Sequence, residues 1–286
     1  MGDTIAAIST AIGEAGIGIV RMSGKESVSI ANKLFKGNKV NYLKDGESRK
    51  LIYGHIINPN DGEIIDEVLI TFMKEPYTYT RENMVEIYCH GGIISVKKVL
   101  ELILDNGARL ADPGEFTKRA FLNGRLDLAQ SEAIIDMIRA KTDKSFQVSL
   151  NQLEGSISNE VKEIMSILLE MIAHIEVSID FPEEDIEDLT YDELEDKARL
   201  VYDRIEKLLN TADRGKILRD GLNTVILGKP NVGKSSLLNA ILRENRAIVT
   251  NIPGTTRDII EEYVNIDGIP LKIVDTAGIR STEDLV

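Results

Sequence analysis

The chain has 286 residues, which is enough for two or more domains with cores of their own. Its 43% hydrophobic and 28% charged residues are typical of a globular protein, and apolar stretches of only about six residues exclude a membrane helix. The single cysteine, Cys89, excludes a disulfide within the chain, so we expect a reducing, cytoplasmic location. Most of the net charge of −13 lies in residues 121–216, with 11 basic and 22 acidic side chains, which argues against a nucleic-acid surface there.

The first 120 residues alternate between short strand-like runs and turns. Residues 17–20, 51–57, 67–73 and 85–88 have the apolar or alternating character of strands. The Asn-Pro-Asn-Asp-Gly stretch at 58–62 is a strong turn signal, and an apolar helix is predicted over 93–104. The pattern predicts a small α+β domain over 1–120.

Residues 121–216 are predicted to be helical. Apolar residues recur at spacings of four and three over 157–175 and again over 194–208, as in antiparallel helices of a bundle. The acidic stretch at 181–185 separates the two; we interpret it as a solvated linker rather than a partner-binding loop.

Residues 217–286 have the order of elements that opens a Ras-like α/β domain. An apolar strand at 222–227 precedes a glycine-rich loop and a leucine-rich helix, and 259–266 and 269–274 flank an Asp267-Gly268 hairpin turn. The predicted fold class is therefore multidomain α/β: an α+β domain, a helical bundle, and the start of a P-loop domain.

The loop Gly-Lys-Pro-Asn-Val-Gly-Lys-Ser at 228–235 matches the P-loop pattern G-x-x-x-x-G-K-[ST] at every fixed position. Its backbone N–H groups can surround an anion, Lys234 can hold the β- and γ-phosphates, and Ser235 can bind Mg²⁺. Because the loop lies between a predicted strand and helix, we favour nucleotide binding over a structural glycine turn.

Two further motifs follow at the spacing of a switch GTPase. Thr256, in Gly-Thr-Thr-Arg-Asp at 254–258, is placed to bind Mg²⁺, and Asp275 begins Asp-Thr-Ala-Gly at a strand end. Ile279 follows where Ras-type enzymes carry a water-orienting glutamine, so hydrolysis must use another group. The predicted nucleotide-binding residues are Asn231, Val232, Gly233, Lys234, Ser235, Ser236, Thr250, Asn251, Ile252, Pro253, Gly254, Thr255, Thr256, Asp275, Thr276, Ala277 and Gly278.

Segments along the whole chain resemble the MnmE (TrmE) family of tRNA-modifying GTPases. They include Asp-Thr-Ile-Ala-Ala at 3–7, Gly-Ile-Gly-Ile-Val-Arg at 16–21, Cys-His-Gly-Gly at 89–92, the stretch 113–125, Asp-Leu-Ala-Gln at 127–130 and Asp-Phe-Pro-Glu-Glu at 180–184. The resemblance implies an N-terminal folate-binding and dimerising domain (1–120), a helical domain (121–216) and a GTPase domain (217–286) cut short at its C-terminus. Guanine specificity rests on this resemblance, because no base-reading motif lies within the chain.

The resemblance also implies a function in tRNA modification. With a flavoprotein partner of the MnmG (GidA) type, such proteins modify carbon 5 of the wobble uridine, using GTP and a tetrahydrofolate such as 5-formyltetrahydrofolate. Arg21, Glu86 and Arg125 match the family's folate contacts, and a carboxylate with two arginines suits a pterin with a glutamate tail. Each alone is more often a surface salt bridge.

The family's potassium site and catalytic glutamate map less completely onto the chain. Asn231 matches the side-chain ligand of K⁺, with carbonyl ligands implied from Thr250, Ile252 and Thr255. Glu283 is a candidate catalytic residue by proximity, but the family spacing places that glutamate just past Val286. We therefore expect the 286-residue chain by itself to be inactive.

Two other functions remain open from the sequence. One is a ribosome-associated switch of the Era/Der kind, and the other is a dimerisation scaffold without modification chemistry. The stretch Tyr77-Thr78-Tyr79-Thr80 is either a platform for a base or pterin or a structured loop, and we expect a structural role for Cys89-His90.

Overall fold

The computed structural model describes residues 2–37, 48–180, 190–228, 232–233, 236–237, 240–241 and 261–274. The chain divides into two compact units, Met1–Asp127 and Leu128–Val286. Each unit has a sheet and helices of its own, and they are described in turn.

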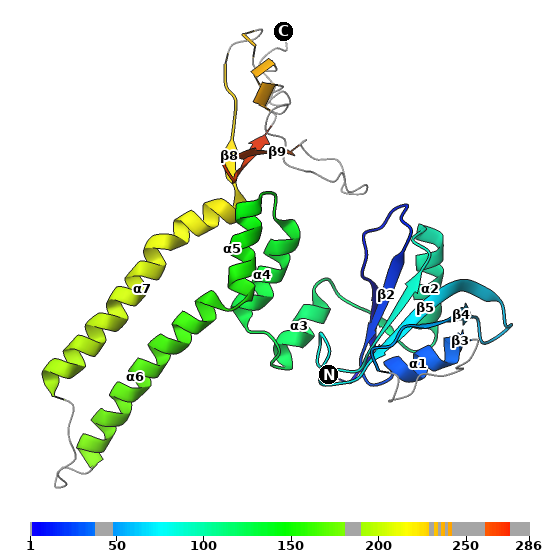
Figure 1. Ribbon diagram of the computed structural model, residues 1–286, viewed down its shortest axis with the longest axis horizontal. Helices are drawn as coiled ribbons and strands as arrows, with labels where there is room; N and C mark the ends of the chain where they lie inside the picture. Colours follow the sequence, from blue (N-terminus) through cyan, green and yellow to red (C-terminus); the bar gives the residue numbers. More distant parts are fainter. Residues whose placement is uncertain are drawn as a thin grey trace, which may run out of the picture. The chain divides into compact units, whose positions relative to one another are not determined.

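The first unit is built on a seven-stranded, mostly antiparallel sheet with strand order β3-β4-β5-β6-β2-β1-β7. Figure 1 labels β2, β3, β4 and β5 of this sheet. Its strands are β1 Ile5–Ile8, β2 Gly18–Ser23, β3 Phe35–Gly37, β4 Ile52–Ile57, β5 Ile64–Met73, β6 Met84–Cys89 and β7 Arg109–Leu110. Among the described strands of this sheet, only β1 and β7 pair in parallel. The helices are α1 Ser27–Leu34, α2 Ile93–Asp105 and α3 Glu115–Leu122. The predicted α+β domain is confirmed, and the turn at 58–62 joins β4 to β5.

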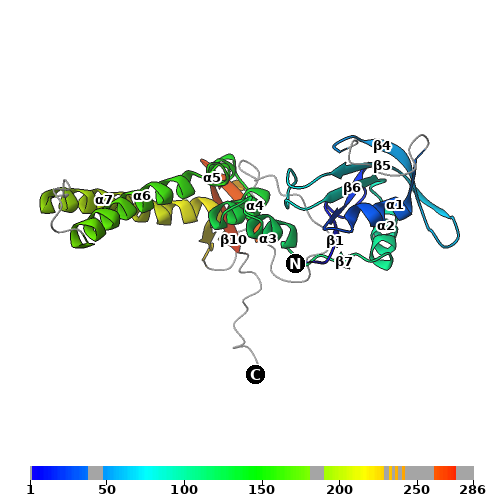
Figure 2. The same ribbon diagram turned by 90° about the horizontal axis from the view of Figure 1, so that it is seen from below.

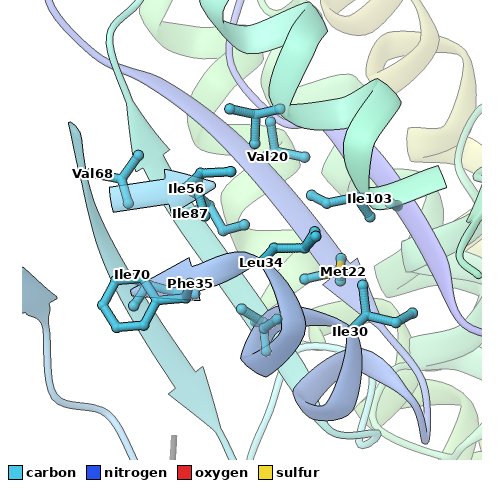
Figure 3. Packing of buried hydrophobic residues seen from close by; sticks show 14 of the residues in the cluster. Val20, Met22, Ile30, Leu34, Phe35, Ile56, Val68, Ile70, Ile87 and Ile103 are labelled. Carbon is cyan, nitrogen blue, oxygen red and sulfur yellow. The ribbon is translucent and has the colours of Figure 1, made fainter. Parts of the chain in front are cut away.

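The core lies between one face of this sheet and helices α1 and α2. Alternate strand residues such as Val20, Ile70 and Ile87 belong to one buried cluster with Ile30 of α1 and Ile103 of α2 (Figure 3). Because successive side chains of a strand point to opposite faces, the intervening residues lie on the other face of the sheet. Arg21 of β2 and Glu86 of β6 belong to that second face.

The second unit begins with four helices. These are α4 Leu128–Arg139, α5 Asp143–Leu153, α6 Ser156–Asp180 and α7 Tyr191–Asp220. Helices α6 and α7 run side by side in both views, as the predicted pair at 157–175 and 194–208 requires (Figures 1 and 2). None of the helices in the described part of the chain is both long enough and apolar enough to cross a membrane.

A three-stranded sheet follows α7 in the same unit. Strand β8 (Leu222–Thr224) pairs in parallel with β10 (Ile269–Val274), which pairs in antiparallel with β9 (Glu261–Ile266). The predicted hairpin is confirmed: its turn residues Asp267 and Gly268 have φ of 50° and 87°, a left-handed geometry that favours glycine. The predicted strand at 222–227 is shorter than expected, since β8 ends at Thr224.

Candidate functional site

A carboxylate–guanidinium pair lies on the second face of the first unit's sheet. Arg21 and Glu86 are direct cross-strand neighbours of β2 and β6. Arg21 donates from Nε at 2.8 Å to Glu86 Oε1, and its Nη2 lies 2.7 Å from the same oxygen. The Tyr88 hydroxyl donates to Glu86 Oε2 at 2.8 Å. Burial, followed by this bond to Glu86, raises the pKa of Tyr88. Glu86 is thus held by two donors in a half-buried position.

The ring of Tyr79 joins Arg125 to this pair. The Arg125 guanidinium lies 4.7 Å from the ring centre and that of Arg21 lies 5.7 Å away, both within cation–π range. Arg125 also donates from Nη1 to the Tyr79 carbonyl at 3.3 Å. The Tyr79 hydroxyl is bonded to Thr117 Oγ1 of α3 at 2.8 Å, and Phe116 of α3 lies 5.8 Å from the Arg21 guanidinium. Residues from β2, β6, α3 and two loops therefore meet around one aromatic ring.

The loop that carries Tyr79 is held by a hydrogen bond within the loop and by bonds to β2 and to the end of α3. Thr78 donates to the Glu82 carbonyl at 2.7 Å, and Asn123, at the end of α3, donates to the Thr80 carbonyl at 2.6 Å. Ser23 of β2 donates to Glu82 Oε2 at 2.7 Å. The stretch 77–80, for which a platform or a structured loop was predicted, is a structured loop that presents the Tyr79 ring to both arginines.

A buried arginine connects this loop to α3 and to the N-terminal strand. Arg119 is 1% exposed, and its guanidinium meets the carboxylates of Asp3, Glu82 and Glu115 at 2.9–3.1 Å. Arg109 also pairs with Glu115, at 2.6 Å, and with Asp3, at 2.8 Å. Hydrogen bonds from Arg109, from the Asp112 backbone and from Arg119 lower the pKa of Glu115 to about 2. This network was not predicted from the sequence, because Arg119 and Asp3 are far apart along the chain.

Cys89 and His90 point to different surroundings, as expected for adjacent residues at a strand end. Cys89 is buried and bonded to the Gly18 carbonyl at 3.3 Å, and burial raises the pKa of its thiol to about 11. The exposed His90 ring meets Asp66 Oδ1 at 2.6 Å, which raises the pKa of the imidazole. The two side chains form no nucleophile–base pair.

Two family models together match nearly the whole chain. The model described as "GTP-binding protein TrmE N-terminus" matches residues 4–125, and "MnmE helical domain" matches residues 128–284, more than half of the chain. The chain belongs to the MnmE (TrmE) family. This confirms the family resemblance read from the sequence. Arg21, Glu86 and Arg125 all lie within the part matched by the TrmE N-terminal model.

Curated relatives carry the same family name. Proteins called "tRNA modification GTPase MnmE" from Alkaliphilus oremlandii and Geobacillus thermodenitrificans are 62% and 60% identical over 284 and 285 residues. The protein of that name from Clostridioides difficile is 61% identical over 284 residues. Each comparison covers 99% of this chain but only 61–62% of the relative. The chain thus spans about 62% of the length of these MnmE relatives.

Only a small part of the predicted MnmE nucleotide site lies in the described residues. Val232, Gly233 and Ser236 are described, and Gly233 has φ of 94° and accepts at 2.9 Å from the Leu237 N–H. The remaining predicted residues lie outside the described ranges: Asn231, Lys234, Ser235, 250–256, 275–278 and the candidate Glu283. Within those ranges, no cluster of three or more His, Cys, Asp or Glu side chains could hold a metal ion.

Proposed function

We propose that this chain belongs to a GTP-hydrolysing component of tRNA modification. The observation that carries the proposal is about 60% identity, over almost the entire chain, to relatives called tRNA modification GTPases. The intact phosphate-loop motif at 228–235 supports it independently. We further propose that carbon 5 of a wobble uridine is the site of modification, that a flavoprotein of the MnmG type is the partner, and that the protein acts in the cytoplasm as a homodimer through residues 1–120.

A tetrahydrofolate is the one-carbon donor that the site of the first unit suits best. The Glu86 carboxylate, partly shielded from water, can accept from N–H groups of a pterin. Arg21 is already paired with Glu86, whereas Arg125 is exposed and its guanidinium contacts only the ring and the carbonyl of Tyr79 among the described interactions. Arg125 is therefore the better partner for the anionic tail of 5-formyltetrahydrofolate. The ring of Tyr79 keeps the two arginines within reach of one ligand.

Nucleotide and cations would be held by the phosphate loop and the two motifs that follow it. Lys234 suits the β- and γ-phosphates, and the hydroxyls of Ser235 and Thr256 suit Mg²⁺. Asn231, with carbonyls of residues 250–255, supplies the hard oxygen ligands that an alkali cation such as K⁺ prefers. A bound cation adds positive charge next to the transferring phosphoryl group. Glu283 remains only a candidate for the catalytic group.

The match of residues 4–125 to the TrmE N-terminal model favours tRNA modification over an Era/Der-like switch. A dimerisation scaffold without chemistry would need no pairing of Arg21 with Glu86 beside an exposed Arg125. A test of folate binding therefore separates tRNA modification from a dimerisation scaffold.

The proposal is tested on the nucleosides of tRNA. In cells that lack the protein, mass spectrometry should show wobble uridines without their carbon 5 substituent, and the full-length gene should restore it. Unchanged wobble uridines in the deletion strain would rule out the proposed function.

A further inference from the structure

The turn between β9 and β10 is fixed to the start of α5 in the second unit. Thr142 Oγ1 donates to the Gly268 carbonyl at 2.8 Å, and the Lys144 ammonium donates to the Asp267 carbonyl. A Cβ at position 268 would overlap the Lys144 side chain, so the aliphatic part of that lysine packs directly on the glycine. Lys141 lies with its ammonium 5.6 Å from the ring centre of Tyr263 on β9. Three residues just before and within the first turn of α5 thus contact the hairpin.

One oxygen of Thr142, Oγ1, forms hydrogen bonds both to α5 and to the hairpin turn. It is the N-cap of α5: its Oγ1 accepts from the Ser145 N–H at 3.1 Å, and its own N–H donates to Ser145 Oγ at 3.1 Å. The single hydroxyl proton has two acceptors in reach, the Gly268 carbonyl at 2.8 Å and Ser145 Oγ at 3.2 Å, and the Gly268 carbonyl is the nearer of the two. Thr142 is 7% exposed, so water competes little for either bond. The capping residue of α5 is therefore also the anchor of the turn.

Strand β10 is also held by the segment that directly follows α7. Strand β8 follows α7 directly through Gly221, which has φ of 79°, and pairs with β10 from Leu271 to Ile273. A Cβ on Gly221 would lie 2.6 Å from the Pro270 carbonyl, so the end of α7 and the start of β10 are in close backbone approach. The hairpin is consequently supported by two different helices of the unit.

The hairpin lies between the two motifs predicted to respond to the γ-phosphate. Residues 250–256 precede β9 along the chain, and residues 275–278 follow β10 immediately. Five residue steps along β10 cover about 17 Å, so the strand connects the docked turn to the second motif as one extended segment. A shift of the turn against α5 would displace the ends of β9 and β10 that meet at the turn, and the chain leads from the other ends of these strands to the two motifs.

We infer that Lys141, Thr142 and Lys144 form a docking site for the Asp267-Gly268 turn that couples the helices of this unit to the two predicted switch motifs. The docking contact is read from the described residues, whereas its link to GTP rests on the proposed function.

The docking contact is tested first without nucleotide, by hydrogen exchange of the 286-residue chain. Thr142→Val keeps the shape of the side chain but loses the hydroxyl bonds to Ser145 and to the Gly268 carbonyl. Exchange in 261–274 should become about fivefold faster, as expected for the one hydrogen bond lost at the turn. Lys144→Met should make hydrogen exchange of the same peptides faster without changing exchange in α5. Ser145→Ala is the matched control, since it weakens the cap and leaves the turn contact in place. Faster exchange confined to α5 in Thr142→Val would overturn the docking site.

The coupling is tested next in the full-length protein with a fluorescent GTP analogue. Lys144→Met should change the nucleotide dissociation rate roughly two- to thirtyfold, the range of coupling seen for residues that contact neither ligand. An unchanged rate in a variant whose hairpin exchanges faster would overturn the coupling. Absence of GTP binding by the wild-type protein would instead refute the proposed function, and the exchange result would still decide the docking site.

Discussion

Replacement of Arg119 by methionine should destabilise the first unit more than the loss of any exposed charge. Methionine fills a similar volume but removes the guanidinium that meets Asp3, Glu82 and Glu115. Glu115 is 7% exposed and would keep only Arg109 as its charged partner, while Glu82 would lose its hydrogen bonds from Arg119. Breaking a buried ion pair by removing one partner costs about 3–5 kcal/mol. Because Arg109 remains and Asp3 is half exposed, we expect the lower end, about 3 kcal/mol.

The loss is measured by hydrogen exchange of core amides in β2 and β6, which report the stability of this unit separately from the second. A drop of about 3 kcal/mol makes their exchange about a hundredfold faster. Lys118→Met is the matched control: it removes the neighbouring, exposed positive charge of the same helix and should change stability by less than about 0.5 kcal/mol. Equal effects of the two substitutions would show that the buried network contributes nothing specific.

The pH dependence gives a second check on the same network. The pKa of Glu115 is held at about 2 in the folded protein, below its usual 4.5. The stability that this provides is complete above pH 4.5 and is lost as the pH falls toward 2. Without Arg119 the folded-state pKa of Glu115 rises, so the difference between wild type and Arg119→Met should shrink over this range. A difference that stays constant down to pH 2 would refute the electrostatic explanation.

Three further predictions follow from the proposed function. Arg21→Ala and Glu86→Ala should each weaken 5-formyltetrahydrofolate binding at least about tenfold in calorimetry, which corresponds to about 1.4 kcal/mol per contact. Lys97→Ala on α2 is the control and should leave the affinity unchanged. Wild-type affinity in both Arg21→Ala and Glu86→Ala would refute the folate site. Sedimentation equilibrium at micromolar concentration should show a dimer, because closed two-fold contacts are the commonest homo-oligomers, and a clean monomer would contradict it. In the full-length protein, GTP hydrolysis should be faster in K⁺ than in Na⁺ and Asn231→Ala should abolish the preference, whereas equal rates in the two salts would exclude the cation mechanism.

Local patterns in the sequence predicted the strands and helices in which apolar residues recur at the regular spacing of a strand or a helix. The alternation in β4 and β5, the turn between them and the apolar helix α2 were all expected within a few residues of their observed bounds. Helices α4 and α5 were not predicted individually, and their fully buried residues are small or polar rather than large and apolar: Ala133 in α4, and Ser145 and Ser149 in α5. Strands β1 and β7 are four and two residues long and exist through their pairing with each other and with β2.

The candidate ligand site shows the same division between local and long-range information. Family resemblance pointed to Arg21, Glu86 and Arg125, but not to the geometry that brings them together. Arg21 and Glu86 are 65 residues apart and meet only because β2 and β6 pair in one register. A shift of one residue would send one of the two side chains into the core, so the pair depends on the whole sheet.

Charges in a sequence are usually assigned to the surface, and Arg119 shows where that assumption fails. In the sequence it follows Lys118 in an unremarkable polar helix, yet Lys118 is exposed and Arg119 is fully buried. What distinguishes them is the position of three carboxylates, two of which come from outside α3. Asp3 reaches Arg119 from the N-terminus and Glu82 reaches it from the loop after Tyr79. Because the same arginine holds that loop to α3, the position of the Tyr79 ring between Arg21 and Arg125 depends on a residue that contacts none of these three side chains in any described interaction.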